Sequence, residues 1–460
     1  MKRNNIANKI KNSLSKLGEI TSLYVEGTVF SVSGLVTEIT GMADHVLPGD
    51  AIVIASRNGP PARGEVVGFN GKVTQAMLFD LLHEIGPGSK ARAYPTLSSQ
   101  PGGTCVIDDQ WLGRVIDPLG IPVDGRGPLI GSQGRMPQGR VPPATLRARL
   151  GPRLDLGVRA LECFVTCRQG QRLGLFSGSG VGKSTLLAMI ARHSSADIIV
   201  VALVGERGRE VREFIEDELG PEGLQRAVVV VATSDSSPLL RRKAADTAMT
   251  VAEHFRDQGK SVLLLMDSVT RFCLALREIA VSKGEPPTMR GYPPSVFSEL
   301  PRFLERAGPG YQGPDGSAGF ITAIFTVLVE GDDHNEPVAD TVRGILDGHV
   351  VLDRHIAETG RYPAINILRS LSRSMPGCNL EHETELVHRA RKIIALHADM
   401  ADMVRLGAYR HGSDDAIDEA LILAPRIDAF LHQQRDEVSS SESSFAMLKE
   451  ALMPATALAP

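Results

Sequence analysis

The stretch GLFSGSGVGKST at residues 174–185 decides the fold of this chain. It follows an apolar run typical of a strand and precedes a helical pattern. A glycine-rich loop between a strand and a helix points its backbone N–H groups at phosphate oxygens, and the positive end of the helix adds to the attraction. The stretch therefore predicts a phosphate-binding P-loop.

The residues expected to line this loop are contiguous: Ser177, Gly178, Ser179, Gly180, Val181, Gly182, Lys183, Ser184 and Thr185. We expect Lys183 and the Ser184 hydroxyl to meet the β- and γ-phosphates and Mg²⁺. Ser177 departs from the strict G-x-x-x-x-G-K-[ST] pattern, since it replaces the first glycine. A serine can take this turn when its φ is negative. The alternative is a glycine-rich turn with an incidental lysine, and the flanking strand and helix argue against it.

Outward from the loop, apolar strand patterns alternate with helical ones. The predicted strands are 172–176, 197–204, 227–231 and 261–266, and the predicted helices begin at Ser184 and cover 207–219 and 239–255. Strands that are apolar throughout and separated by helices belong to parallel sheets covered on both faces. We therefore expect an α/β core.

Two carboxylates follow predicted strands, at the sheet edge where ligands of open α/β sheets bind. Glu206 follows the strand 197–204 and is the candidate residue for orienting the attacking water, with a helix N-terminal carboxylate that satisfies the dipole as the alternative. Asp267 follows the apolar run 262–266, a Walker B pattern, and would hold magnesium through Ser184 or a water.

The flanking regions have other patterns. Residues 1–22 carry apolar side chains at helical spacing and predict an amphipathic helix, either packed on its own domain or docked on a partner. Residues 23–95 show short alternating segments with regular turn signals, which predicts a small β-barrel. We assign 96–375 to the α/β domain that carries the P-loop and 376–460 to a helical domain whose serine-rich tail is expected to fray.

The composition of the chain indicates which cellular compartment to expect. The chain has 460 residues, of which 42% are apolar, and 50 basic against 54 acidic residues give a net charge of −4. No apolar run approaches the roughly 20 residues that span a bilayer, and the N-terminus lacks a continuous apolar core. Five scattered cysteines suit a reducing compartment. We expect a cytoplasmic protein without a cleaved signal.

Taken together, several further motifs resemble the catalytic family of rotary ATPases. They are LGRVIDPLGIPVD at 112–124, GERGRE at 205–210, MDSVTRF at 266–272, RGYPPSVFSELPRFLERAG at 290–308, GDDHNEPVADTVRGI at 331–345 and YPAINILRSLSR at 362–373. Within that family the chain resembles the homohexameric ATPases of type III protein export, and among these the flagellum-specific group. The resemblance implies a RecA-like P-loop ATPase core with an N-terminal β-barrel and a C-terminal helical domain.

The resemblance also implies roles for single residues. Glu206 takes the position of the catalytic carboxylate and Arg207 that of a phosphate-side arginine. Glu210 and Asp267 belong to the magnesium environment, and Tyr362 forms an aromatic wall near the adenine.

Arg373 matches an arginine finger that reaches into the neighbouring subunit's site. Nothing in the dipeptide Ser372-Arg373 alone would suggest this role. A trans arginine that neutralises transition-state charge is worth roughly 10³–10⁵ in rate.

By the same resemblance we expect ATP and Mg²⁺ as cofactors, with ATP hydrolysed at subunit interfaces of a homohexameric ring to energise export of flagellar proteins across the bacterial inner membrane. The implied partners are a flagellar export regulator, stalk-like proteins, the export gate and chaperone–substrate complexes. The implied location is the cytoplasm, with peripheral association to the inner-membrane export apparatus.

Three alternatives stay open at this point. Injectisome ATPases share every motif above. A ring-shaped RNA translocase would need a basic barrel, and residues 21–95 carry 5 basic and 7 acidic residues, so we expect no nucleic-acid partner. A non-catalytic ring subunit should lack the water-orienting carboxylate, and Glu206 is present.

Overall fold

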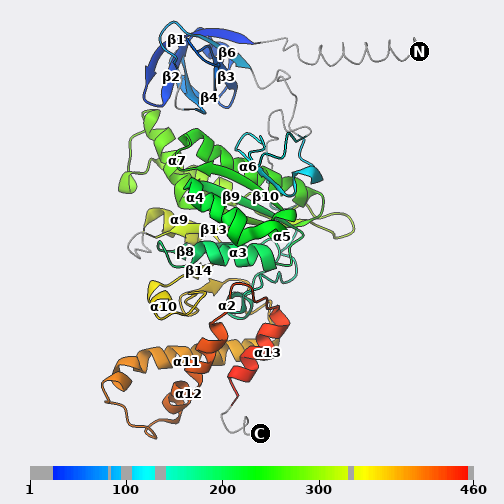
Figure 1. Cartoon of the computed structure of the whole chain (residues 1–460), viewed down its shortest axis with the longest axis vertical. Coiled ribbons are helices and arrows are strands. Elements are labelled where there is room, and N and C mark those ends of the chain that lie inside the picture. Colours follow the sequence, from blue (N-terminus) through cyan, green and yellow to red (C-terminus); the bar gives the residue numbers. More distant parts are fainter. Residues whose placement is uncertain (1–23, 81–83, 95–105, 130–140, 330–335, 454–460) are drawn as a thin grey trace, which may run out of the picture.

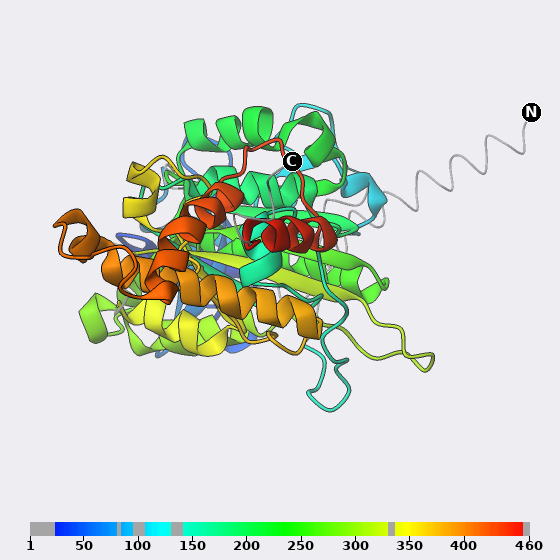
Figure 2. The ribbon, with the colours of Figure 1, turned by 90° about the horizontal axis from the view of Figure 1, so that it is seen from below.

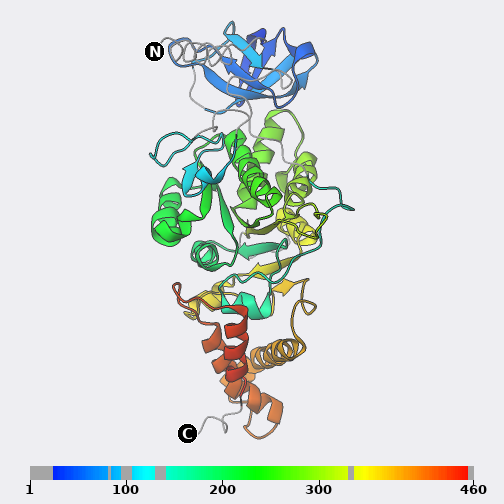
Figure 3. The same cartoon turned by 90° about the vertical axis from the view of Figure 1, so that its right-hand side faces the viewer.

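The chain folds into three parts stacked along one long axis, as the computed structural model shows in Figure 1 and, from the side, in Figure 3. It describes residues 24–80, 84–94, 106–129, 141–329 and 336–453. The barrel lies at one end, the large sheet with its helices in the middle, and the C-terminal helices at the other end. The predicted amphipathic helix at 1–22 falls outside the described residues.

The N-terminal part is a closed six-stranded barrel with the strand order β1-β2-β5-β4-β3-β6. Its strands are β1 (Val25–Ser33), β2 (Val36–Thr40), β3 (Ala51–Ile54), β4 (Ala62–Asn70), β5 (Val73–Leu78) and β6 (Lys90–Tyr94). Alternate side chains, such as Ile52 and Ile54, point into the barrel and are buried. Closure leaves no unpaired edge in this small domain.

The central part is a mostly parallel sheet in the order β15-β14-β8-β13-β11-β9-β10-β7, with β12 (Gly308–Pro309) beside β13. Its strands are β7 (Arg114–Ile116), β8 (Arg172–Ser177), β9 (Ile198–Glu206), β10 (Ala227–Thr233), β11 (Ser261–Asp267), β13 (Phe320–Leu328), β14 (Gly348–Val351) and β15 (Leu371–Ser372). The expected α/β core with a RecA-like nucleotide-binding fold is confirmed.

Helices cover both faces of this sheet. Val200 and Ala202 of β9 lie in one core with α6 (Pro238–Asp257) and α7 (Val269–Ser282), whereas Val201 and Leu203 lie in the other core with α3 (Lys183–His193). All nine residues of β9 are therefore buried, which is why the strand reads as continuously apolar. The other central helices are α2 (Arg159–Phe164), α4 (Gly208–Glu213), the π-helical η3 (Phe214–Leu219), α5 (Gly220–Gln225), α8 (Pro294–Leu304), α9 (Pro337–Ile345) and α10 (Arg354–Glu358).

One edge strand comes from sequence that showed no assignable element. β7 pairs in parallel with β10, and Arg114 is held to Asp124 by an ion pair of 2.6 Å. The turn-rich stretch around residues 112–124 therefore contributes a strand to the sheet. Its turn-rich sequence hid a strand of only three residues.

The C-terminal part consists of α11 (Glu381–Arg405), α12 (Asp415–Leu431) and α13 (Ser441–Ala451), which lie together in front of the sheet in Figure 2. The prediction that the serine-rich tail is frayed is wrong for residues 441–451, because they form α13. Ser440 caps α13 by accepting a hydrogen bond from the N–H of Ser443, and Phe445 and Leu448 are buried in the core shared with the ATPase domain. Among the described residues, no helix is long and apolar enough to cross a bilayer.

Candidate nucleotide-binding and catalytic site

The loop between β8 and α3 has the shape expected of a phosphate cradle. β8 ends at Ser177 and α3 begins at Lys183, so the glycine-rich residues join a buried strand directly to a helix N-terminus. Gly180 and Gly182 have φ angles of 77° and 90°, a region in which side chains are strained. Ser177 avoids this region, which explains why a serine is tolerated there.

Lys183 points across the sheet edge to β11. Its ammonium contacts Oδ1 of Asp267, and the same oxygen accepts a hydrogen bond of 2.8 Å from the hydroxyl of Thr326 on β13. Asp267 is 5% exposed. Three adjacent strands thus bring the P-loop lysine, the Walker B carboxylate and a buried hydroxyl to one point.

Glu206, the last residue of β9, lies beside this cluster. Its side-chain oxygens are 3.8 Å from Nζ of Lys183 and 3.9 Å from a guanidinium nitrogen of Arg271. Oε1 is buried and has no hydrogen-bond partner among the residues that the structure describes. Burial, and then the charge of Asp267, raise the pKa of Glu206 to about 7, although Lys183 opposes the shift. A carboxylate of that pKa is suited to accept a proton near neutral pH.

The sequence did not suggest Thr326 or Arg271 as site residues. Thr326 lies in the middle of an apolar strand, and its role depends on β13 lying next to β11, which the chain order does not reveal. A faint signal existed for Arg271. Gly205 has a φ of 75°, and a Cβ there would lie 3.1 Å from Cβ of Arg271, so only glycine lets the two segments come this close.

Arg207 and Glu210 lie at the rim of the site. Arg207 precedes α4, its side chain is 78% exposed, and it pairs with Glu210 at 4.0 Å. Glu210 also faces Glu206 and adds to the rise of its pKa. Ser184 is exposed in the first turn of α3, and the hydroxyl of Thr185 donates to Glu218 at 3.4 Å.

Tyr362 packs directly against the P-loop although it is 180 residues away in sequence. A Cβ on Gly182 would lie 3.5 Å from its ring, and the ring is 44% exposed. A guanidinium nitrogen of Arg354, on α10, donates to the carbonyl of Ser179 at 3.2 Å. One wall of the loop is therefore aromatic and open to a ligand.

Arg373 is not brought to this site within its own chain. It directly follows β15, at the edge of the sheet five strand positions from β9, a separation of about 24 Å at the usual strand spacing. Ser372 pairs with Gly348, at the amino end of β14, so Arg373 also lies toward the opposite end of the strands from the P-loop. Any part Arg373 plays in hydrolysis requires a second subunit.

The residues fit a nucleoside triphosphate. The turns at Gly180 and Gly182 allow the loop to direct backbone N–H groups at phosphates, and Lys183 supplies a cation. Oε1 of Glu206, which has no hydrogen-bond partner among the described residues, offers an acceptor for a proton. No cluster of three metal-ligating side chains occurs in the described part of the chain. A Mg²⁺ bound with a nucleotide takes several of its ligands from phosphates and water, so one or two protein groups suffice.

Comparison with known proteins gives the same picture. Residues 157–372 match the nucleotide-binding domain of the ATP synthase alpha/beta family, and residues 380–450 match the C-terminal domain of the type III secretion ATPase EscN. The Flagellum-specific ATP synthase of Caulobacter vibrioides is 49% identical, over 96% of this chain and 99% of the relative.

Two solved structures of EscN from enteropathogenic E. coli are also similar. The assembled ATPase superposes with a TM-score of 0.82 at 38% identity, covering 93% of this chain and 100% of EscN. EscN in complex with its central stalk EscO gives a TM-score of 0.81 at 38% identity over the same shares.

The P-loop, its companion carboxylates and these matches define a nucleotide-binding ATPase of the ATP synthase alpha/beta class. Within that class the chain belongs to the ATPases of the type III protein export family, with the flagellum-specific enzymes among its relatives.

Proposed function

We propose that the protein hydrolyses ATP at the subunit interfaces of a homohexameric ring and so energises export of flagellar proteins across the bacterial inner membrane. The observation that carries the hydrolytic part is the buried Glu206, whose Oε1 has no hydrogen-bond partner among the described residues and lies 3.8 Å from Nζ of the P-loop lysine. A nucleotide-binding subunit without catalysis would need no such carboxylate.

In this proposal the chain's own groups divide the work. Ser184 and Asp267, with Glu210 nearby, would hold Mg²⁺, which neutralises charge on the transferred phosphate when it is bound. Lys183 moves from Asp267 to the phosphates, and Glu206 accepts a hydrogen bond from the attacking water. Tyr362 provides the adenine wall, and Arg207 lies on the phosphate side at the rim.

Arg373 completes the site from the neighbouring subunit. Its side chain is exposed, and it lies toward the end of the strands opposite its own P-loop, so a ring is the arrangement that would give it a role. The assembled state of the similar EscN supports this oligomer. A trans arginine is worth roughly 10³–10⁵ in rate, and a lone subunit should then be nearly inactive.

The experiment is to measure phosphate release against protein concentration while light scattering follows assembly. We expect the rate per subunit to rise steeply where rings form, and Arg373→Ala to remove the rise without preventing assembly. A rate per subunit that stays constant through dissociation contradicts the trans mechanism.

The partners and the location are part of the same proposal. A central stalk like the one bound by EscN, an export regulator, the inner-membrane export gate and chaperone–substrate complexes would contact the ring from the cytoplasm. The flagellar assignment rests on the relatives named Flagellum-specific ATP synthase. In the host, deleting the gene should abolish secretion of flagellar subunits, and only a catalytically active copy should restore it. Normal flagellar export in the deletion strain contradicts the assignment and favours the injectisome alternative.

A further inference from the structure

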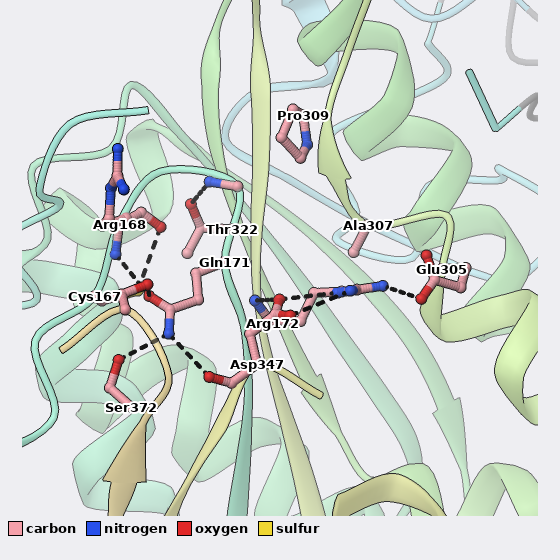
Figure 4. A network of polar contacts seen from close by, with 12 residues as sticks. Cys167, Arg168, Gln171, Arg172, Glu305, Ala307, Pro309, Thr322, Asp347 and Ser372 are labelled. Atoms are coloured by element: carbon pink, nitrogen blue, oxygen red, sulfur yellow. Dashed lines mark hydrogen bonds and ion pairs between the residues drawn. The ribbon is translucent and has the colours of Figure 1, made fainter. Parts of the chain in front are cut away.

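A buried glutamine organises the sheet edge that carries Arg373. Gln171 immediately precedes β8 and is 0% exposed. Its amide nitrogen donates to the hydroxyl of Ser372 at 2.9 Å and to the carbonyl of Asp347 at 3.2 Å. Its amide oxygen accepts from the hydroxyl of Ser374 at 2.9 Å and from the N–H of Arg168 at 3.0 Å. All four hydrogen-bonding positions of the side chain are filled, and Figure 4 shows the network around it.

Two of these partners are the residues on either side of Arg373. The hydroxyl of Ser372 also donates to the carbonyl of Thr166 at 2.8 Å. The N–H of Arg373 donates at 2.9 Å to the carbonyl of Asp347, the same carbonyl that accepts from Gln171. Residues 372 and 374 are thus hydrogen-bonded to the side chain of Gln171, and residue 373 is hydrogen-bonded to Asp347, a partner of Gln171.

Asp347 is itself fixed by hydrogen bonds and an ion pair. The carboxylate of Asp347 accepts from the backbone N–H of Arg172 at 3.0 Å and from its guanidinium at 3.1 and 3.3 Å. The other side of the guanidinium pairs with Glu305 at 2.5 Å. Figure 4 shows Arg172 between the two acids. The anchor of Arg373 therefore includes groups from β8, the end of α8 and the start of β14.

The Arg373 side chain contrasts with this clamped backbone. It is exposed, and within the described ranges its guanidinium has no hydrogen bond or ion pair, whereas Ser372 beside it is 2% exposed. A rigid backbone under an unpaired cation lowers the entropy lost when that cation meets an anion.

We propose that Gln171 is a positioning residue for Arg373: its amide fixes residues 372–374, so that the guanidinium is presented away from its own subunit toward the neighbour's nucleotide. This proposal rests on the trans role of Arg373 described above. Displacement of such a group by about 1 Å is enough to cost on the order of 100-fold in rate.

The test is a double-mutant cycle with Gln171→Leu and Arg373→Ala. Leucine keeps most of the volume and removes all four hydrogen bonds. We expect Gln171→Leu to lower kcat about 10- to 100-fold, with the affinity of its own P-loop for ADP unchanged and rings still formed. The double variant should be no slower than Arg373→Ala alone, because both changes remove the same effect.

Two further variants keep the test sharp if Gln171→Leu folds poorly. Ser374→Ala removes one tether from a half-buried position and should lower kcat by a few fold, again without an added effect in Arg373→Ala. Gln433→Leu is the matched control, because Gln433 is also buried and its amide makes three hydrogen bonds, to Arg159, Gly157 and Glu437. Any effect of Gln433→Leu on kcat should add to that of Arg373→Ala, because Gln433 and Arg373 share no hydrogen-bond partner among the described residues.

The outcomes separate the two proposals. If Arg373→Ala collapses turnover while Gln171→Leu and Ser374→Ala keep it, or slow the double variants further, the positioning role is overturned and the trans arginine stands. If Arg373→Ala keeps full turnover in rings, the trans arginine fails and the role of Gln171 fails with it.

Discussion

Nζ of Lys183 lies 3.8 Å from Oε1 of Glu206 and also contacts Asp267, so one ammonium forms ion pairs with two buried carboxylates. A triphosphate would draw the lysine toward its own oxygens and leave both acids for water and metal. In the proposed mechanism nucleotide binding depends on Lys183 and hydrolysis on Glu206, so a variant of one residue should affect one step and not the other.

Glu206→Gln should keep nucleotide binding and lose turnover. The amide keeps the shape but cannot accept a proton, and loss of a general base typically costs about 10²–10⁴ in rate. Titration with a fluorescent ATP analogue and phosphate release measure the two quantities. Glu216→Gln is the control, because Glu216 is 56% exposed and pairs only with Arg212 among the described residues. Turnover retained in Glu206→Gln would show that another group is the base.

The pH dependence of the free enzyme should report the same carboxylate. The pKa of Glu206 is raised to about 7, so the group is protonated and inactive below that pH and becomes a base above it. We expect kcat/KM to rise tenfold per pH unit on the acid side and to level off above about pH 7 to 8. Initial rates between pH 5.5 and 9 test this, and a profile that is flat from pH 5.5 to 8 contradicts it.

Thr326→Val should leave the Walker B carboxylate of Asp267 less firmly positioned. The valine keeps the shape of the buried threonine but removes the 2.8 Å hydrogen bond to Asp267, and hydrogen bonds to charged groups are worth about 1.5–3 kcal/mol. We expect kcat to fall roughly tenfold and the Mg²⁺ requirement to rise. Thr322→Val on the same strand is the control, because the Thr322 hydroxyl accepts from Gly170, away from the site. Equal Mg²⁺ requirements in the two variants would contradict a role for Thr326 at Asp267.

The parts of the site that the sequence revealed are those encoded locally. The P-loop follows β8, and Glu206 and Asp267 end the largely apolar strands β9 and β11; parallel pairing brings these strand ends to one sheet edge. The barrel showed itself through its short alternating strands in the same way.

The rest depends on which segments become neighbours. Thr326 matters because β13 lies beside β11, and Gln171 matters because two serines 200 residues later pack on it. The serine-rich tail looked unstructured because its polarity is obvious and its partners are distant. Ser441 in fact donates to Glu162, 279 residues earlier.

Tyr362→Ala should weaken ATP binding, because the ring packs on Gly182 and is 44% exposed beside the loop. Stacking of a base on an aromatic ring is worth about 1–3 kcal/mol. We expect the Kd for ATP to rise about 5- to 150-fold, Tyr362→Phe to bind nearly as the parent does, and binding of inorganic triphosphate to be unaffected. A loss of triphosphate affinity in Tyr362→Ala would show instead that the ring supports the P-loop.

The attachment of α13 should make stability depend on pH through Glu162. This carboxylate is 1% exposed, accepts hydrogen bonds from the N–H groups of Leu156 and Gly157 at 2.6 and 2.8 Å, and accepts another from the hydroxyl of Ser441 at 2.8 Å. Burial, followed by the charge of Asp155, raises its pKa from 4.5 to about 8. The folded protein therefore binds more protons than the unfolded chain between these two values, so the free energy of unfolding falls as pH rises through this range.

Glu162→Gln should remove most of this dependence. The amide oxygen can still accept from the two backbone N–H groups, and the amide nitrogen can donate to Ser441, whose hydroxyl then donates to Asp155. Urea unfolding of parent and variant at pH 6, 7, 8 and 9 measures the difference. The parent should lose on the order of a few kcal/mol across this range and the variant much less. Glu206 titrates in both proteins and so contributes equally to both. If the free energy of unfolding changes with pH by the same amount in parent and variant, Glu162 is already ionised at pH 6.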